Sequence, residues 1–260
     1  MPDNMTDTSS IQYNRELFEL VHREGYQPPE RSLKRLEWIA SQVPTDSRTV
    51  LDVGSGPGFL SKLLVQHGFR VTSLDLVLDS LRRFTGARAQ ADASRLPFAD
   101  RSFDVVLCAE VVEHLRDSER EAAFREIWRV SRQHVMITVP YREQLNASLV
   151  RCDRCGMKFH AWGHQASFDE RRLNGAFPLP PTGFRYMLRE TLSYHPALLA
   201  VRQRTLGHYG HEDLIKCPGC SNSEVQPRRR SIPVRLLDRM NQWLRYSRKD
   251  GWILASYERP

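Results

Sequence analysis

The stretch Thr49–Leu60, T-V-L-D-V-G-S-G-P-G-F-L, constrains the fold more than any other part of the chain. Its first half is a short apolar run typical of a buried strand. Three glycines at alternate positions follow it, Gly54, Gly56 and Gly58, and apolar residues then recur at helical spacing from Phe59. A strand, a glycine loop and a helix N-terminus in this order predict a site for a nucleotide-type ligand, because glycine lets a ligand approach the backbone closely.

The glycine spacing narrows the kind of ligand. It is G-x-G-x-G rather than the G-x-G-x-x-G of dinucleotide-binding folds, in which a pyrophosphate rests on the helix N-terminus. Asp52 also stands in the strand just before the loop. A carboxylate there would repel a pyrophosphate but would suit a ligand with an ammonium group, such as S-adenosylmethionine. Taken alone, the loop is equally compatible with a plain structural turn.

Two more aspartates follow the loop at positions that a doubly wound fold would bring to the same ligand. Arg70–Asp75 is predicted to be the second strand, and its last residue can accept hydrogen bonds from both hydroxyls of a ribose. The alternative role for Asp75 is the N-cap of a following helix. Asp92 comes next, after a weakly marked third strand, and Phe103–Cys108 is predicted to be the fourth strand.

These motifs, in this order, resemble those of the class I S-adenosylmethionine-dependent methyltransferases. The matching stretches are L-D-V-G-S-G-P-G, A-D-A-S-R-L-P-F-A-D-R-S-F-D-V-V and A-E-V-V-E-H-L, and they are similar to the branch that includes the quinone-biosynthesis enzymes. The resemblance covers roughly residues 48–141. It implies a Rossmann-like α/β fold whose seven-stranded sheet is mostly parallel.

The resemblance also implies which residues bind S-adenosylmethionine. In the family, an aspartate at the place of Asp92 accepts from the adenine amino group, and the next backbone N–H meets the ring. The implied cofactor-binding residues are Asp52, Gly54, Ser55, Gly56, Gly58, Asp75, Leu76, Asp92, Ala93 and Glu110. One departure is Ser131–His134, which stands where the family places a Pro-Gly-Gly turn before its fifth strand, expected here at Val135–Val139.

Four of the five cysteines form two C-x-x-C pairs, Cys152 with Cys155 and Cys217 with Cys220. Two such pairs supply the four thiolates of a structural zinc site. Because 61 residues separate the pairs (217 − 155 − 1), the metal would clip together the ends of an insertion rather than form a compact finger. The alternative is four free cysteines. A catalytic zinc would need an open ligand position, which four cysteines do not leave.

Three histidines are candidate general bases for an acceptor. His160 and His164 lie in F-H-A-W-G-H-Q, after the predicted fifth strand, where a methyltransferase builds its acceptor site. Packing around the cysteines is an equally strong alternative, and two histidines four apart on one helix face could also join the metal. His114, which follows the fourth strand, is the third candidate, with a hydrogen bond at a helix end as its alternative role.

Composition and charge limit the class of protein. Of the 260 residues, 40% are hydrophobic and 27% are charged, as in soluble globular proteins. No apolar run approaches the ~18 residues of a membrane span, and the N-terminus lacks the apolar core of a secretory signal, so we expect a cytoplasmic protein. The net charge is +7, and residues 216–260 carry ten Lys/Arg against four Asp/Glu. This basic tail is either a solvated face or a contact for an anionic partner.

The sequence therefore predicts an S-adenosylmethionine-dependent methyltransferase with a structural zinc. Its acceptor would be an O or N atom of a small molecule or of a glycan or lipid precursor. The alternatives are an RNA methyltransferase that grips with the basic tail and the cysteine pairs, and a non-catalytic methyltransferase-like scaffold. RNA is less favoured, because A-E-V-V-E-H rather than an N-P-P-Y-type motif follows the fourth strand.

We expect four parts in the chain. Residues 1–47 would form an N-terminal helical lid, and residues 48–141 the Rossmann-like core that binds the cofactor. Residues 142–227 would form the zinc-binding insertion on the substrate side, including a sixth strand at Gly183–Leu192. Residues 228–260 would add a C-terminal helix and a final strand, expected at Trp252–Tyr257, which completes the sheet next to the sixth.

Overall fold

The computed structural model of the chain describes residues 15–19, 22, 26–152, 154–192, 194–205, 216–222, 232–244 and 247–260. All of the first fourteen residues of the predicted lid, and residues 223–231 of the basic tail, thus lie outside the described residues. Among the helices that the structure describes, none is both long and apolar enough to cross a membrane.

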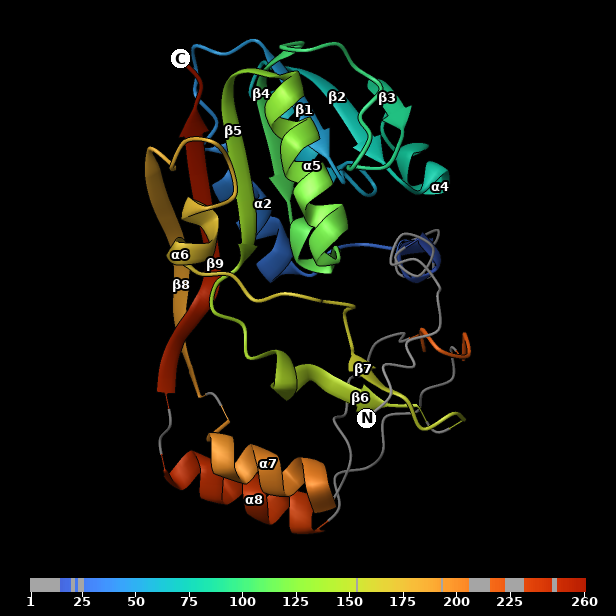
Figure 1. Ribbon diagram of the computed structural model, residues 1–260, viewed down its shortest axis with the longest axis vertical. Helices are drawn as coiled ribbons and strands as arrows, with labels where there is room; N and C mark the ends of the chain where they lie inside the picture. The colour runs from blue at the N-terminus through green and yellow to red at the C-terminus, as the bar shows by residue number, and fades with distance from the viewer. Residues whose placement is uncertain are drawn as a thin grey trace.

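A seven-stranded sheet forms the centre of the molecule, with the strand order β3-β2-β1-β4-β5-β9-β8 (Figure 1). Its strands are β1 Thr49–Val53, β2 Arg70–Asp75, β3 Ala87–Gln90, β4 Phe103–Ala109, β5 Ser131–Pro140, β8 Gly183–Leu192 and β9 Ser247–Glu258. The first five are parallel, and β9 lies antiparallel between β5 and β8. This architecture confirms the predicted Rossmann-like sheet.

Helices cover both faces of the sheet. The helices of the core are α2 Glu30–Ala40, α3 Phe59–Gln66, α4 Leu78–Leu81, the 3₁₀ helix η1 Val112–His114, α5 Asp117–Val130 and α6 Glu170–Asn174. The remaining elements are the 3₁₀ helix η2 Leu145–Ser148, the strands β6 Leu149–Arg151 and β7 Lys158–His160, and the helices α7 Pro196–Thr205 and α8 Ile232–Trp243. In Figure 1, β6, β7, α7 and α8 lie below the sheet, on the side where its parallel strands end.

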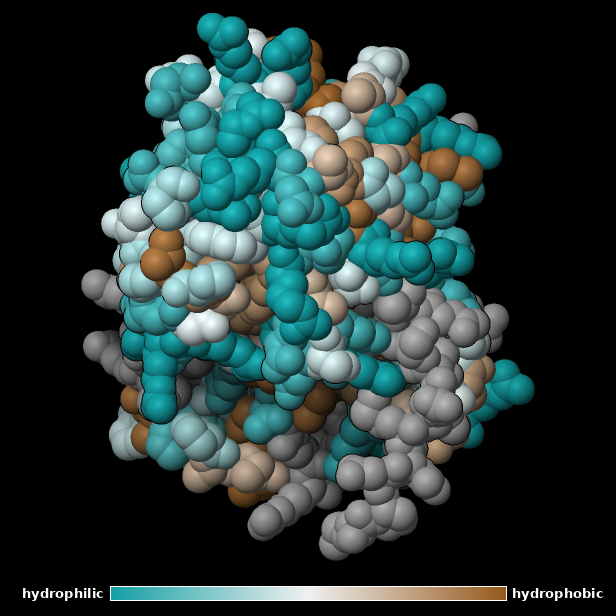
Figure 2. All heavy atoms as spheres, turned by 45° about the horizontal axis from the view of Figure 1, so that its top comes forward, coloured by the Kyte–Doolittle hydropathy of each residue, from teal (hydrophilic) through white to brown (hydrophobic). Residues whose placement is uncertain are grey.

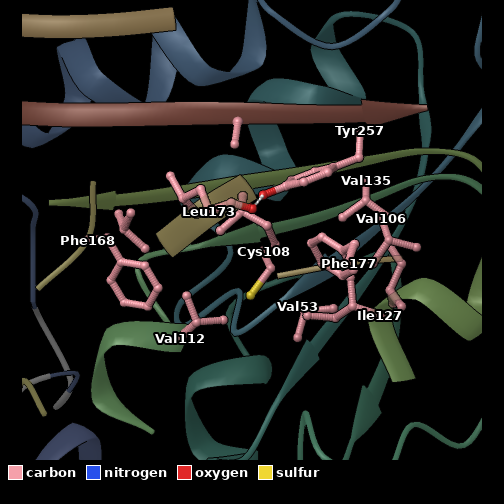
Figure 3. Packing of buried hydrophobic residues seen from close by; sticks show 14 of the residues in the cluster. Val53, Val106, Cys108, Val112, Ile127, Val135, Phe168, Leu173, Phe177 and Tyr257 are labelled. Carbon is pink, nitrogen blue, oxygen red and sulfur yellow. Dashed lines mark hydrogen bonds between the residues drawn. The ribbon is translucent and has the colours of Figure 1, made fainter. Parts of the chain in front are cut away.

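The two apolar clusters of the core reflect the alternation of side chains along each strand. In β4, Val106 and Cys108 face one cluster, whereas Val105 and Leu107 face the other. The first cluster packs against α5 and also receives Phe168, Leu173 and Phe177 from the segment around α6 (Figure 3). The hydroxyl of Tyr257 in β9 donates to the carbonyl of Leu173 at 2.7 Å, so the chain after β7 is tied to the sheet.

The second cluster packs β1, β4 and β5 against α2 and α3, with Ile39 and Leu64 fully buried in it. Strands buried on both faces read as continuous apolar runs rather than as alternating ones, which is why the short run in β1 was a clear signal. Figure 2 views the molecule from the side where the parallel strands begin. Most of the side chains visible on this face are hydrophilic.

The structure differs from the sequence prediction at Ser131–His134, which belongs to β5 rather than to a turn before it. The helix α5 ends at Val130, and Ser131 already has extended dihedral angles, φ −75° and ψ 136°. Any residue adopts this conformation, so no glycine is needed there. A register shift between Phe103 and Val105 absorbs the irregular pairing at the start of β5.

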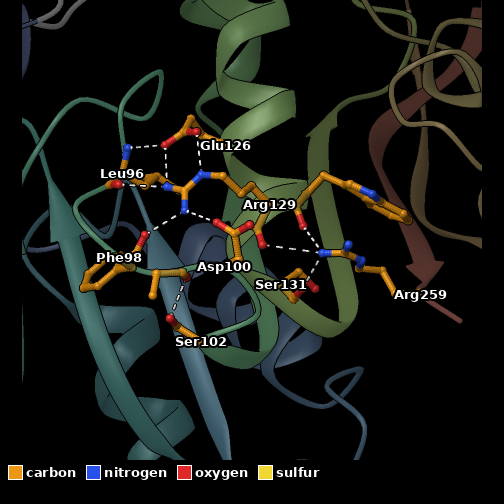
Figure 4. A network of polar contacts seen from close by, with 10 residues as sticks. Leu96, Phe98, Asp100, Ser102, Glu126, Arg129, Ser131 and Arg259 are labelled. Atoms are coloured by element: carbon orange, nitrogen blue, oxygen red, sulfur yellow. Dashed lines mark hydrogen bonds and ion pairs between the residues drawn. The ribbon is translucent and has the colours of Figure 1, made fainter.

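A polar network joins α5 to the loop that follows Asp92 (Figure 4). The guanidinium of Arg129 donates to the carbonyls of Leu96 and Phe98 and pairs with the carboxylates of Asp100 and Glu126. The carboxylate of Glu126 also accepts a hydrogen bond from the backbone N–H of Leu96 at 2.8 Å. This network fixes the loop on which a candidate cofactor residue stands.

Candidate active site

The glycine loop leaves β1 at the carboxyl edge of the sheet in a left-handed conformation. Gly54, Gly56 and Gly58 have φ angles of 73°, 52° and 76°. The backbone N–H groups of Gly54 and Ser55 both donate to the carbonyl of Leu74, at 2.7 and 3.0 Å. The loop is therefore held against the end of β2. A Cβ on Gly54 would lie only 2.2 Å from a methyl group of Val111, so no larger residue fits without movement.

Asp52 and Asp75 lie buried beneath and beside this loop. A carboxylate oxygen of Asp52 accepts from the hydroxyl of Ser61 in α3 at 2.6 Å. Burial raises the pKa of Asp52 to about 7, opposed by the Ser61 hydrogen bond and reinforced by the nearby charge of Asp75. Asp75 accepts from the backbone N–H of Gly56 at 2.7 Å and of Val77 at 2.8 Å, and burial raises its pKa as well.

The predicted alternative for Asp75, an N-cap, does not describe its contacts. The N-cap of α4 is Val77, two residues after Asp75, and its own side chain makes no capping hydrogen bond. Asp75 instead links the end of β2 to the glycine loop through Gly56. A role toward a ribose stays a prediction.

Leu76, Asp92 and Ala93 follow two strand ends that lie side by side, because Asp75 pairs with Gln90 in the register of β2 and β3. The side chain of Gln90 donates to the carbonyl of Leu76 at 3.1 Å. Asp92 accepts from the backbone N–H of Ser94 at 2.7 Å. The structure therefore brings all three sequence candidates to the same edge as the glycine loop.

Glu110 follows β4 at the same edge and has a left-handed backbone, with φ 59°. One of its carboxylate oxygens accepts from Arg35 at 3.0 Å and from the indole N–H of Trp252 at 2.9 Å. The other oxygen is buried without a hydrogen bond from the residues that the structure describes. Burial raises the pKa of Glu110, opposed by Arg35 and Trp252. Sequence reasoning missed both partners, which lie 75 and 142 residues away.

Three aromatic side chains of the N-terminal segment lie over the glycine loop. His22 stacks on Phe18 with 5.5 Å between ring centroids and contacts Tyr26 at 5.6 Å. A Cβ on Gly56 would lie 3.0 Å from the His22 ring. Burial, together with the charge of Arg83, lowers the pKa of His22 to about 4. The sequence analysis expected a lid in this region, but no pattern singled out His22.

The three candidate bases form one cluster, although they come from two separate stretches of chain. The ring of His164 stacks on His160 at 4.7 Å and meets the edge of His114 at 4.6 Å between centroids. One possibility left open by the sequence, that His160 and His164 are neighbours on a helix face, is wrong. His160 ends β7, and His164 follows in a loop. The two rings meet because the chain turns through Gly163, which has φ 73°.

A carboxylate that sequence reasoning missed, Glu143, lies between two of these histidines. One of its oxygens is 2.5 Å from Nδ1 of His164, and the other is 3.4 Å from Nε2 of His160. Burial alone would raise the pKa of Glu143, but its hydrogen bonds and the nearby histidine charges lower that pKa to about 2. The residue stands just after β5, in a stretch without periodicity that would mark it.

The four cysteines of the two C-x-x-C pairs come together, and their sulfur atoms all lie within 4.8 Å of one another. Cys152 and Cys220 are 3.6 Å apart, and Cys155 and Cys217 are 3.5 Å apart. These distances are too long for disulfides. They are close to the about 3.8 Å that a tetrahedral ion with bonds of about 2.3 Å would impose.

The two cysteine pairs have matching turns. Gly156 donates its N–H to the carbonyl of Cys152, and Ser221 donates to that of Cys217, each at 2.9 Å. Both donors have left-handed backbones, with φ 77° and 53°. This repeated conformation, together with the convergence of the sulfur atoms, fits a closed metal site formed by cysteines alone. Neither His160 nor His164 belongs to this group.

Comparison with known proteins gives the class of this core. Residues 51–139 match the family described as "Methyltransferase domain". The chain is 35% identical over 105 residues to the ubiquinone biosynthesis O-methyltransferase of Xylella fastidiosa (strain 9a5c), covering 36% of this chain and 43% of that relative. The corresponding protein of Ralstonia nicotianae is 36% identical over 96 residues, covering 32% and 39%. The chain thus matches about two fifths of the length of these relatives.

Solved structures share the fold over most of the chain. The [4+2]-cyclase SpnF has a TM-score of 0.55 at 14% identity, with 97% of each chain covered. The protein BH2331 of Bacillus halodurans C-125 has a TM-score of 0.53 at 14% identity, covering 88% of this chain and 99% of that one. The family match identifies residues 51–139 as a methyltransferase domain, and the sheet topology is Rossmann-like.

Replacing Gly54 by alanine should destabilise the folded protein by about 2 kcal/mol or more. The new Cβ meets Val111, and a left-handed backbone costs an L-residue about 1–2 kcal/mol. Urea unfolding measures the loss. Gly183→Ala is the matched control, because Gly183 has open space around it, and it should stay near neutral. The double variant Gly54→Ala/Val111→Ala should recover part of the loss. Equal stability of Gly54→Ala and the wild type would contradict this account.

The raised pKa of Asp52 makes stability depend on pH. Between about pH 4 and pH 7 the unfolded chain has an ionised Asp52 and the folded chain a protonated one, so folding takes up a proton. This proton uptake adds to the free energy of unfolding. The added stability is fully present below about pH 4 and is lost as pH rises toward 7. It amounts to at most about 4 kcal/mol, because an aspartate in the unfolded chain has a pKa near 3.9.

Urea unfolding of the ligand-free protein across this pH range tests the prediction. The free energy of unfolding of the wild type, minus that of Asp52→Asn, should fall as pH rises from 4 to 7. The exposed Asp46→Asn variant is the control and should follow the wild type. Parallel curves for wild type and Asp52→Asn would show that Asp52 does not titrate in this way.

Proposed function

We propose that this protein is an S-adenosylmethionine-dependent O-methyltransferase that acts on a small molecule or on a glycan or lipid precursor. The observation that supports the proposal most directly is the meeting of four groups at one sheet edge. They are the left-handed glycine loop, Asp75, Asp92 and Glu110, and all lie within the matched residues 51–139. The relatives named above act on oxygen according to their names, so oxygen is a better acceptor than nitrogen.

The residues present fit S-adenosylmethionine. The loop at Gly54–Gly58 has a left-handed backbone at each of its three glycines, and Glu110 keeps one buried oxygen without a hydrogen bond from the described residues. Asp75 would hold the ribose, Asp92 and the backbone after it the adenine, and the buried carboxylates Asp52 and Glu110 the cationic end. When bound, S-adenosylmethionine supplies an electrophilic methyl group.

The protein's own contribution to methyl transfer would be mainly positioning, since holding two reactants in line at near contact removes much of the barrier. Phe18, His22 and Tyr26 would form a lid that keeps water from the loop. The histidine cluster after β5 would receive the acceptor and remove its proton. The fold alone does not establish this chemistry, because SpnF shares it and is described as a [4+2]-cyclase.

We also propose that the four cysteines hold a structural zinc ion. The ion would join the β6–β7 hairpin to residues 216–222, two segments that enter and leave the insertion far apart in sequence. Around it, Val150, Phe159 and Leu199 form a small apolar cluster of their own. A closed site of four thiolates has no ligand position for a substrate, so its role would be to hold the acceptor side in place.

Isothermal titration should show that the protein binds S-adenosylmethionine with a dissociation constant in the micromolar range. Asp75→Ala should weaken binding about 10- to 100-fold, because a hydrogen bond to a charged group contributes about 1.5–3 kcal/mol. The exposed Asp79→Asn variant, in the neighbouring helix α4, is the control and should bind as the wild type does.

The same preparation tests catalysis. Tritium-labelled S-adenosylmethionine and a panel of catechols and nucleotide sugars should show transfer of label to an acceptor. No binding by the wild type in the micromolar range would overturn the proposed function. Binding without transfer to any acceptor would instead favour the scaffold alternative, or a different reaction on the same fold.

Metal analysis of the purified protein should find one zinc ion per chain, and Cys217→Ser should lose most of it. Cys108→Ala is the matched control, because Cys108 is the fifth cysteine, is buried in the core and lies outside the cluster. It should keep the wild-type zinc content. Sub-stoichiometric zinc that is unchanged by Cys217→Ser would refute the zinc proposal.

A further inference from the structure

The sequence alone does not distinguish the roles of His114, His160 and His164. Their hydrogen bonds in the structure do. A neutral imidazole carries its proton on one nitrogen and a lone pair on the other, and the partners of each nitrogen decide which. The inference rests on the proposed function for the identity of the reaction, but the assignment of protons rests only on contacts within the protein.

The lone pair of neutral His160 is engaged by the backbone. Its Nδ1 faces the backbone N–H groups of Trp162 and His164, at 3.3 and 3.2 Å. Because backbone N–H groups only donate, Nδ1 must carry the lone pair, and the proton of neutral His160 is on Nε2. That Nε2 lies 3.4 Å from an oxygen of Glu143 and makes no hydrogen bond to the described residues. The lone pair of neutral His160 is thus taken by backbone N–H groups and cannot receive an acceptor's proton, and the side chain is only 4% exposed.

His164 has the opposite arrangement. Its Nδ1 lies 2.5 Å from the second oxygen of Glu143. With the pKa of Glu143 lowered to about 2, this oxygen is a carboxylate oxygen that only accepts, so Nδ1 carries the proton. The lone pair of neutral His164 is then on Nε2. The His164 side chain keeps 11% exposure, more than His160 has.

His114 does not compete for this role. Burial, reinforced by the charges of His164 and His160, lowers its pKa well below the ordinary value, and it is hydrogen-bonded to the backbone of Trp162. Its ring meets His164 edge to face. His114 therefore packs behind His164 as a neutral ring.

Backbone contacts place His164 beside the cofactor edge of the sheet. The N–H groups of Gln165 and Ala166 donate to the carbonyl of Glu113 at 2.7 and 3.3 Å. Glu113 belongs to η1, two residues after Val111, which packs against the glycine loop at Gly54. The loop that carries His164 is thus fixed to the segment that borders the predicted methyl donor.

We propose that Glu143 is a positioning residue that fixes the tautomer of His164, and that Nε2 of His164 is the base that accepts the acceptor's proton. The acceptor O–H bond breaks as its oxygen forms a bond to the methyl carbon, and the proton moves to Nε2. The electron pair of the broken carbon–sulfur bond stays on the sulfur. Glu143 remains ionised and stabilises the imidazolium of His164, as the third group of a nucleophile–base–carboxylate arrangement does.

Nitrogen NMR of the ligand-free protein with ¹⁵N-labelled histidine tests the tautomers without any acceptor. Imidazole two-bond correlations should show a proton on Nδ1 of His164 and on Nε2 of His160, assigned with His164→Gln and His160→Gln. In Glu143→Gln the fixed pattern of His164 should be lost, because an amide presents an N–H₂ group as well as an oxygen. A proton on Nε2 of neutral His164, or an unchanged pattern in Glu143→Gln, would overturn the proposal.

Activity separates the two roles from binding. His164→Gln and Glu143→Gln should bind S-adenosylmethionine as the wild type does, but lower kcat about 10²- to 10⁴-fold for any catechol that the wild type methylates. The exposed His67→Gln and Glu121→Gln variants are the matched controls and should keep the wild-type kcat. A wild-type kcat in His164→Gln would overturn the proposal about the base. If the wild-type protein does not bind S-adenosylmethionine, the proposed function is refuted instead.

Discussion

The parallel pairing of β1 with β2 and β4 is the constraint on which the rest of the structure depends. Val53 lies opposite Leu74 on one side and Cys108 on the other, so these three strands end at the same level. Whatever follows each strand then emerges at one edge of the sheet. The glycine loop, Asp75 and Glu110 meet there for this reason, although Gly54 and Glu110 are 56 positions apart in the sequence (110 − 54).

That edge concentrates buried carboxylates, and this has an energetic consequence. Burial raises the pKa of Asp52, Asp75, Glu110 and Glu113, so each is harder to ionise than in water. Backbone N–H groups and Arg35 offset only part of this cost. A ligand that brings positive charge would offset more of it, which fits the sulfonium and ammonium groups of the proposed cofactor.

The insertion links two sites through the alternation of a single strand. In β7, Phe159 faces the cluster of cysteines and apolar residues, whereas His160 faces Glu143 on the other side. The sequence analysis treated zinc packing and an acceptor site as rival roles for this stretch. Because neighbouring residues of a strand point to opposite faces, the stretch can serve both roles at once. The proposed metal would thereby hold the histidine cluster in place.

The sequence by itself determined the sheet, the glycine loop and the likeness to methyltransferases, because apolar runs, glycines and strand-end carboxylates are local signals. Residue type and spacing in the sequence also identified the two cysteine pairs and the three histidines as candidate site residues. Only the tertiary structure decided their partners. Arg35 in α2 and Trp252 in β9 reach Glu110 across 75 and 142 residues, and Glu143 reaches His164 across 21 residues, from one loop to another. Such contacts depend on how distant segments pack together, and a local sequence pattern does not indicate which segments will do so.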